Sequence, residues 1–198
     1  MKPIFTTVLL VLSMTAFAAE LTVEENKAGF KTLFNGKDFS GWRFAGSADG
    51  TAPNWKVDAG IIKLSGGGKP HLATEREFGD FELRFEWRSV GEKYNSGLFI
   101  RSGTNLGQNQ LNLAKGSEGA FIGGKITGAK GVPDLQKPAK EWNEWRVRAV
   151  GELVTFWCNG KVAWEGTGMK TLKGHIGLQA EGAAMEFRNL RINEIKNP

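Results

Sequence analysis

The chain has 198 residues, with 26 Lys and Arg against 21 Asp and Glu, and 40% of its residues are hydrophobic. This length is in the range of one domain, and the apolar content is sufficient for a hydrophobic core. The basic residues are interleaved with acidic ones and form no Lys/Arg block, so nucleic-acid binding is not expected. A single cysteine, Cys158, excludes an intramolecular disulfide, and two histidines are too few for a three-His zinc site. No cofactor is predicted, although an oxygen-ligated divalent cation is left open without an Asp-rich loop to support it.

Residues 1–18 have the features of a secretory signal peptide. Lys2 supplies a positive end, Val8–Leu12 is a short apolar run, and Ala16-Phe17-Ala18 is an A-x-A cleavage site. The apolar run is too short to span a bilayer, and no later segment is long or apolar enough, so no membrane span is expected. We therefore expect cleavage before Ala19 and an exported protein, either periplasmic or extracellular.

One short helix and many short strands are predicted next. The segment Thr22 to Glu25 is a capping box, which predicts a helix from about Val23 to Ala28 within a lead-in of residues 19–29. Apolar and polar residues then alternate in short runs, which favours an all-β antiparallel sandwich in one domain over residues 30–198. Strands are expected at Phe30–Phe34, Trp55–Val57, Ile61–Leu64, His71–Thr74, Phe81–Val90, Ser96–Arg101, Gln110–Leu113, Glu144–Val150, Leu153–Cys158, Lys161–Glu165, His175–Gln179 and Met185–Ile192.

Turn signals connect several of these strands. Asp58-Ala59-Gly60 and Asn159-Gly160 predict tight hairpins. The widest break in the alternation runs from Ala114 to Glu141, and a long irregular segment in a compact domain is usually functional or disordered.

The stretch from Asp80 to Arg101 is the most informative part of the sequence. Apolar residues from Phe81 to Trp87 alternate with the charged residues Glu82, Arg84, Glu86 and Arg88, which predicts a strand with one apolar and one charged face. The charged face is either a solvated surface or the floor of a polar groove. Glu82 and Glu86 lie about 13 Å apart along such a strand. That is too far for a glycosidase carboxylate pair, which needs about 5–9.5 Å, so either one would need a partner such as Glu181.

Several other residues have both a structural and a functional interpretation. Alternation places His175, Gln179 and Glu181 on the polar side of one strand, where His175 is either a structural residue or part of a site. Trp157 and Trp42 are the better candidates for stacking on a sugar, Trp42 being expected in a loop, while Trp87 and Trp145 are expected in the core.

Several motifs occur here in one order. They are Leu33–Lys37 with Gly41-Trp42, Gly79–Leu83, Asn95–Arg101, Glu141–Asn143, Asn159-Gly160, and Gly174–Gln179 with Glu186–Leu190. Together they resemble the DUF1080 family, also called the 3-keto-disaccharide hydrolase domain, over Phe30 to about Ile195.

The resemblance implies a concanavalin A-like jelly roll of two antiparallel sheets and exported proteins that act on glycosides oxidised at C3. The implied chemistry is removal of the acidified C2 proton, departure of the C1 substituent, and addition of water. On this hypothesis the catalytic residues are Glu181 as the preferred base, Glu86 as a second choice, and Arg101 at the 3-oxygen. The substrate-binding residues are Arg84, Asn95, Gln110, Asn112, Glu118, Lys125, Gln179, His175 and Trp157.

The sequence also departs from the family pattern. Relatives often have a Glu-x-Gln pair where this chain has Gln110 and Asn112, and many have a His where this chain has Ala180-Glu181-Gly182. Amides can hold hydroxyls but cannot act as a base near neutral pH. A non-catalytic, lectin-like carbohydrate-binding module is therefore the alternative, and an upstream sugar dehydrogenase is a candidate partner.

Overall fold

The computed structural model describes residues 21–196. The predicted signal peptide, residues 1–18, lies outside the described residues. In the described part of the chain, no helix has the length and apolar character needed to cross a membrane.

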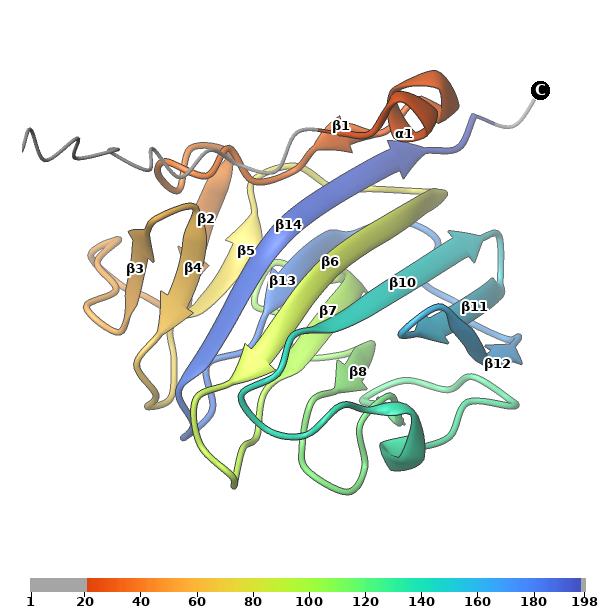
Figure 1. Cartoon of the computed structure of the whole chain (residues 1–198). Helices are drawn as coiled ribbons and strands as arrows, with labels where there is room; N and C mark the ends of the chain where they lie inside the picture. Colours follow the sequence, from red (N-terminus) through yellow and green to blue (C-terminus); the bar gives the residue numbers. More distant parts are fainter. Residues whose placement is uncertain (1–20, 197–198) are drawn as a thin grey trace, which may run out of the picture.

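Two antiparallel sheets pack face to face, which confirms the predicted all-β jelly roll (Figure 1). Sheet A has the spatial order β12-β11-β10-β6-β14-β4-β3, with β1 beside β14, and sheet B has the order β2-β5-β13-β7-β8-β9. The strands of sheet A are β1 (Lys31–Thr32), β3 (Trp55–Asp58), β4 (Ile61–Leu64), β6 (Phe81–Ser89), β10 (Asn143–Val150), β11 (Leu153–Cys158), β12 (Lys161–Gly166) and β14 (Met185–Glu194). The strands of sheet B are β2 (Trp42–Ala45), β5 (His71–Thr74), β7 (Gly97–Ser102), β8 (Gln110–Asn112), β9 (Phe121–Ile122) and β13 (His175–Leu178).

The lead-in helix α1 (Val23–Ala28) has the predicted bounds. The Glu25 amide donates to Thr22 Oγ1, and the Glu25 carboxylate accepts from the Thr22 amide, which completes the capping box. Gly29 ends the helix with a φ of 90°, a left-handed conformation that suits glycine. The helix lies beside the end of β14 (Figure 1).

Both predicted hairpins are present. Ala59 and Gly60 link β3 to β4 with φ values of 51° and 76°, and Asn159 and Gly160 link β11 to β12 with φ values of 50° and 79°. Two positive φ angles are the signature of a tight turn whose twist matches that of the paired strands.

Two strands were not predicted. The segment expected as a loop at Trp42 is strand β2, which pairs with β5. Trp42 is buried, and its indole Nε1 donates to the Leu33 carbonyl at 3.1 Å, so it belongs to the core and not to a stacking site. The short strand β9 and a 3-10 helix, η1 (Pro133–Leu135), lie within the long irregular segment between residues 114 and 141.

The core lies between the sheets and follows the predicted alternation. Phe81, Leu83, Phe85 and Trp87 of β6 are all fully buried in it. Cys158 is buried as well, and burial raises the pKa of its thiol to about 12. Such a thiol stays protonated at neutral pH and is a core residue.

Candidate functional site

A row of polar side chains crosses the outer face of sheet B. Leu72, Leu178 and Leu98 lie side by side on β5, β13 and β7 and point into the core. Because successive residues of a strand face opposite ways, their neighbours lie on the outer face. Continuing the register gives an outer row of His71, Gln179, Gly97 and Asn112.

Gln110 completes this row by lying across Gly97. A Cβ atom at Gly97 would be 2.0 Å from Gln110 Nε2, so only glycine leaves room for the Gln110 side chain there. Gln110 Nε2 donates to Gln179 Oε1 at 2.7 Å, which joins β8 to the end of β13 over β7. Gln110 Oε1 and Gln179 Nε2 keep hydrogen-bonding capacity that a sugar hydroxyl could use.

His71 was not predicted as a site residue, although it belongs to this row. Burial, with a smaller contribution from the charge of Lys69, lowers the pKa of His71, so the ring is neutral at pH 7. His71 Nδ1 accepts from the Ala180 amide at 3.2 Å, which leaves the proton on Nε2 as a donor. The sequence predicts a strand at His71–Thr74, but it does not show that this strand pairs with β13 or that His71 lies beside Gln179.

Glu181 and Asn95 lie beside the middle of the polar row, beyond the ends of β13 and β7. The Gln179 amide donates to the Gly97 carbonyl at 2.9 Å, and Glu181 and Asn95 are each two residues further along the chain from this bond. Glu181 is exposed, and within residues 21–196 its carboxylate makes no ion pair. The Gly182 amide donates to the Gly67 carbonyl at 2.9 Å, which anchors the turn that carries Glu181.

The rest of this face has an apolar floor. Ala45, Ala73, Phe99 and Leu106 form a small buried cluster on the outer side of sheet B. Leu106 fills the space above Gly177, where an added Cβ would be 2.3 Å from its side chain. The Phe99 ring lies 5.5 Å from the His71 ring, so the polar row borders a buried aromatic side chain.

The remaining residues predicted near this face are spread along its edges. Asn112 Nδ2 donates to Ser117 Oγ at 2.8 Å, and Lys125 is exposed in the loop after β9. His175 lies at the far end of β13, with Nδ1 2.9 Å from the Thr74 carbonyl. Glu118 is buried, accepts from the Tyr94 hydroxyl and the Gly116 amide, and lines a separate cavity of about 370 Å³.

Arg101 does not lie in this site, so its predicted contact with the 3-oxygen is wrong. Its side chain is fully buried at the end of the sandwich. Its guanidinium pairs with Asp80 at 2.8 Å and donates to the carbonyls of Gly79 and Gly151. Arg101 and Glu181 lie at opposite ends of the β7–β13 pair, about six residues or 20 Å apart along the strands. The expectation that they share one hollow is therefore wrong.

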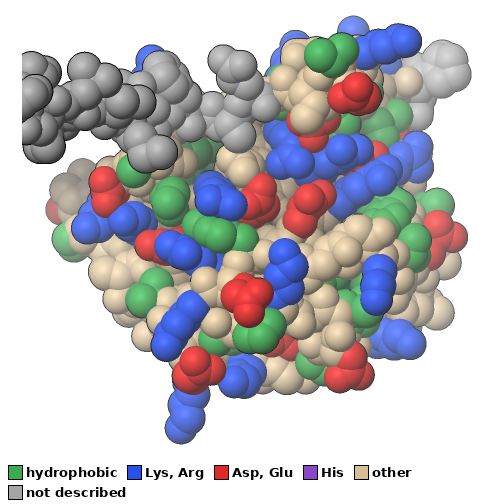
Figure 2. All heavy atoms as spheres, viewed as in Figure 1, with side chains coloured by type: hydrophobic (Ala, Val, Ile, Leu, Met, Phe, Trp, Pro, Cys, Tyr) green, Lys and Arg blue, Asp and Glu red, His purple; other side chains and the backbone are tan. Residues whose placement is uncertain are grey.

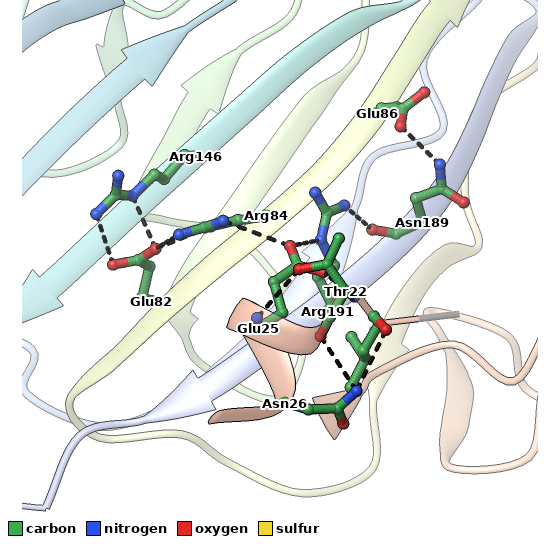
Figure 3. Close-up of polar contacts among 10 residues, drawn as sticks. Thr22, Glu25, Asn26, Glu82, Arg84, Glu86, Arg146, Asn189 and Arg191 are labelled. Carbon is green, nitrogen blue, oxygen red and sulfur yellow. Dashed lines mark hydrogen bonds and ion pairs between the residues drawn. The ribbon is translucent and has the colours of Figure 1, made fainter. Parts of the chain in front are cut away.

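Arg84, Glu86 and Trp157 lie on the outer face of sheet A, away from the polar row. Figure 2 shows this face, with acidic and basic side chains mixed along it. Glu86 accepts from Asn189 at 2.6 Å (Figure 3) and from Arg188 at 2.8 Å, so both of its carboxylate oxygens are bonded. Arg84 pairs with Glu82 and with Glu25 of helix α1. The prediction that these residues join Glu181 is wrong because β6 and β11 belong to sheet A.

Among the described residues there is no group of three or more His, Cys, Asp or Glu side chains that could hold a metal ion. The polar row contains amides, one neutral imidazole and one carboxylate. It can hold hydroxyls and supply a proton donor and a base.

Comparisons with known proteins identify the relatives of this chain. The family model described as a 3-keto-alpha-glucoside-1,2-lyase-like domain matches residues 29–193. A curated 3-keto-disaccharide hydrolase from Bacteroides thetaiotaomicron is 39% identical over 79 residues, which cover 36% of this chain and 27% of that protein. The matched part is thus about a quarter of the length of that relative.

Solved structures show the same architecture. A candidate glycosyl hydrolase from Parabacteroides distasonis has a TM-score of 0.72 at 21% identity, and the match covers 89% of this chain and 99% of that one. A β-glucanase from Bacillus licheniformis has a TM-score of 0.53 at 14% identity, covering 85% of this chain and 99% of that one. At these identities the likeness concerns the jelly-roll fold alone.

Proposed function

This chain belongs to the 3-keto-alpha-glucoside-1,2-lyase-like domain family, and from that premise we propose that it is an exported enzyme that cleaves 3-keto-glycosides at the outer face of sheet B. The observation that carries the proposal is the polar row of His71, Gln179 and Gln110, together with the exposed Glu181, which lies two residues beyond Gln179 in the chain. Export is supported by the signal-like segment at residues 1–18.

The proposed reaction begins with proton removal from C2. A 3-keto group acidifies this proton, because the resulting charge is delocalised onto the 3-oxygen as an enediolate. Glu181 is the proposed base, since a carboxylate without an ion pair can accept the proton. His71 Nε2–H and the Gln179 amide are donors that could stabilise the charge on the 3-oxygen.

The second stage is departure of the C1 substituent and addition of water. The C1–O bond breaks as the electron pair of the enediolate forms the C1–C2 double bond, and the leaving oxygen takes up the proton that Glu181 removed from C2. Water then adds across this double bond, so the net reaction is hydrolysis. Gln110 and Asn112 would hold ring hydroxyls during both stages, with Asn95 at the edge of the site.

Incubation with oxidised disaccharides tests the proposal directly. The purified protein is incubated with 3-keto-trehalose and 3-keto-sucrose, with and without added divalent cations, and release of the free sugar is followed by chromatography. Unoxidised trehalose and sucrose serve as controls and are expected to remain intact, because their C2 protons are not acidified. A folded protein that releases no sugar from any 3-keto substrate would reject the proposed activity.

A non-catalytic carbohydrate-binding module is the second candidate. It is favoured by Gln110 and Asn112, which occupy positions where relatives often have Glu and Gln. The amides of Gln110 and Asn112 cannot act as bases. Binding of saccharides without turnover of any 3-keto substrate would support this candidate.

The enzymatic proposal also implies a preceding reaction. Its substrate must first be oxidised at C3, so a sugar dehydrogenase is the class of enzyme proposed to act upstream.

A further inference from the structure

The outer face of sheet A has a small cleft that the proposed reaction does not use. The cleft has a volume of about 150 Å³ and is lined by Arg84, Glu144, Arg146, Trp157 and Gly160. We call it the Trp157 cleft. It lies on the opposite side of the sandwich from the polar row of sheet B, because its lining residues come from β6, β10 and the β11–β12 hairpin.

The cleft contains an ordered set of hydrogen-bond donors. Arg84, Arg146 and Trp157 are direct cross-strand neighbours on β6, β10 and β11. Both guanidinium groups pair with the same carboxylate, Glu82, at 2.8 Å, and the Glu82 side chain is only 10% exposed (Figure 3). A buried carboxylate between two arginines fixes their positions before any ligand arrives.

Trp157 is held in a defined orientation at the edge of the cleft. The Arg146 guanidinium carbon lies 4.1 Å from the centre of the Trp157 ring, a stacking contact that fixes one face of the indole. The residue is half-buried, so part of the ring remains accessible. An indole fixed in this way loses little conformational freedom when a ligand stacks on it.

The opposite wall is also rigid and provides an acceptor. Asn159 Oδ1 accepts from the Glu144 amide at 2.9 Å, and Asn159 Nδ2 donates to the Leu135 carbonyl at 2.8 Å. These bonds hold the hairpin against β10. Glu144 itself is exposed, and its carboxylate makes no ion pair in the part of the chain that the structure describes. It can therefore accept hydrogen bonds from a ligand.

The charges within the cleft are balanced. The two positive charges of Arg84 and Arg146 face the negative charges of Glu82 and Glu144. An anionic ligand would gain little from such a site. Adjacent hydroxyl groups, by contrast, both donate and accept, and the C–H face of a sugar ring packs against an aromatic ring. We propose that the Trp157 cleft is a second saccharide-binding site that takes a neutral sugar unit.

The surface beyond the cleft extends the proposed site along β10. Trp142 precedes this strand, and Trp142, Glu144 and Arg146 are spaced two residues apart along the outer face. The Trp142 ring lies against Arg188 and Arg88, whose guanidinium carbons are 3.9 and 4.6 Å from its centre. Trp142 and Arg146 are about 13 Å apart along the chain. The ligand is therefore an oligosaccharide of neutral sugars with more than one unit in contact.

Fluorine NMR of protein labelled with 5-fluorotryptophan tests this site without requiring turnover. The chain has seven Trp residues, and Trp157→Phe and Trp142→Phe assign the two relevant resonances by their disappearance. Titration with maltotriose, cellotriose or laminaritriose is expected to shift the Trp157 and Trp142 resonances in a saturable way. The Trp164 resonance is the internal control, because Trp164 is buried on the neighbouring strand β12 and should not move.

Substitutions then measure the contribution of the ring. Trp157→Ala is expected to raise the dissociation constant for the bound trisaccharide about tenfold, as expected for loss of an aromatic anchor. Arg148→Gln is the matched control on the same face and is expected to leave the constant unchanged, since Arg148 does not line the cleft. Unshifted resonances of the buried Trp residues show that each variant is folded.

Two outcomes would overturn the proposal. If no neutral trisaccharide shifts the Trp157 resonance at millimolar concentration, the cleft binds no saccharide. If only trigalacturonic acid shifts it, and added salt abolishes the shift, the cleft is an anion site and the argument from balanced charge is wrong.

Discussion

The two outer faces of the sandwich use their polar groups in different ways. At the outer face of sheet A, the carboxylates of Glu82 and of Glu25 from α1 are each bonded to two arginines (Figure 3), and the carboxylate of Glu86 is bonded to Arg188. On sheet B, Gln110 and Gln179 bond to each other and keep further hydrogen-bonding capacity, and Glu181 has no ion pair among the described residues. The bonded carboxylates of Glu25, Glu82 and Glu86 therefore stabilise the fold and fix the positions of their arginines, whereas the polar groups of sheet B that have spare capacity can contact a ligand.

The ion pairs on the outer face of sheet A follow from the strand register. Arg84 lies directly between Arg146 and Arg191 on the neighbouring strands, and like charges side by side destabilise a sheet. Glu82 pairs with Arg84 and Arg146, while Glu25 pairs with Arg84 and Arg191. The negative charges of two largely buried carboxylates thus offset the positive charges of three guanidinium groups. Because one of these carboxylates is Glu25, the same ion pairs attach helix α1 to this face.

The largest expected effect belongs to Arg101, which lies on neither face. Arg101→Ala should lower the free energy of unfolding by about 3–5 kcal/mol, since it removes the buried guanidinium that donates to Asp80 and to two backbone carbonyls. Urea denaturation followed by Trp fluorescence measures this loss. Arg148→Ala is the control for loss of an arginine on the outer face of sheet A. An Arg101→Ala variant with unchanged stability but no turnover would instead indicate a catalytic role for Arg101.

The second prediction compares one carboxylate from each face. Glu181→Gln should lower kcat on a 3-keto-disaccharide by about 100-fold or more, the contribution of a general base, while substrate affinity changes little. Glu86→Gln should keep the activity, because Glu86 lies on sheet A and is bonded to Arg188 and Asn189. Steady-state kinetics on both variants decides between the faces. Loss of activity in a folded Glu86→Gln variant would move the active site to sheet A.

Most of the fold could be predicted from the sequence. Alternation in β6 correctly placed Phe81 and Trp87 inside and Glu82 and Glu86 outside, and the capping box gave the start of α1. Strand β2 was missed because it is short and follows a loop signal at Gly41, and only its pairing with β5 makes it a strand.

The candidate site could be predicted only in part. Alternation shows that a side chain points outward, but a sandwich has two outer faces and the strand order decides between them. Gln179 and Glu86 both point outward, yet they lie on opposite sides of the molecule. Arg101 was misplaced for a different reason, since it has a φ of 44° and its side chain turns toward Asp80. Local pattern does not reveal such a turn.

The third prediction concerns the attachment of α1 to sheet A. Glu25→Gln should lower the free energy of unfolding by about 2 kcal/mol, because Arg84 and Arg191 lose their shared charged acceptor. Glu24→Gln in the same helix is the matched control and should cost less, since Glu24 is exposed. Equal losses of unfolding free energy in the two variants would show that the negative charge in the helix, and not the contact with sheet A, provides the stabilisation.

The same variant has a defined pH dependence. Burial raises the pKa of Glu25, but hydrogen bonds from Arg191 and the Thr22 amide and the charges of Arg191 and Arg84 outweigh it, so the net pKa is lowered from 4.5. A carboxyl group with a lowered pKa stabilises the folded state above 4.5, and this contribution is lost as the pH falls through the folded-state pKa. The difference between wild type and Glu25→Gln should therefore shrink below about pH 4.5. A difference that stays constant down to pH 3 would contradict the assigned ion pairs.

The smallest expected effect compares two arginines of one strand and one face. Arg146 stacks on Trp157 and pairs with Glu82, whereas Arg148 has no carboxylate partner within residues 21–196. Arg146→Gln should cost about 1 kcal/mol of unfolding free energy, and Arg148→Gln should stay within about 0.5 kcal/mol of wild type. Chemical denaturation of the two variants side by side measures the difference.

This pair also tests how the charges of sheet A are arranged. The Arg146 side chain is 33% exposed, so solvent weakens its ion pair, and most of the expected loss comes from the packing of the guanidinium on the indole. Arg146→Lys keeps the charge but cannot stack as a planar group, and it should therefore behave more like Arg146→Gln than like wild type. If Arg146→Lys retained full stability, charge alone would matter at this position, and the orientation of Trp157 would no longer depend on Arg146.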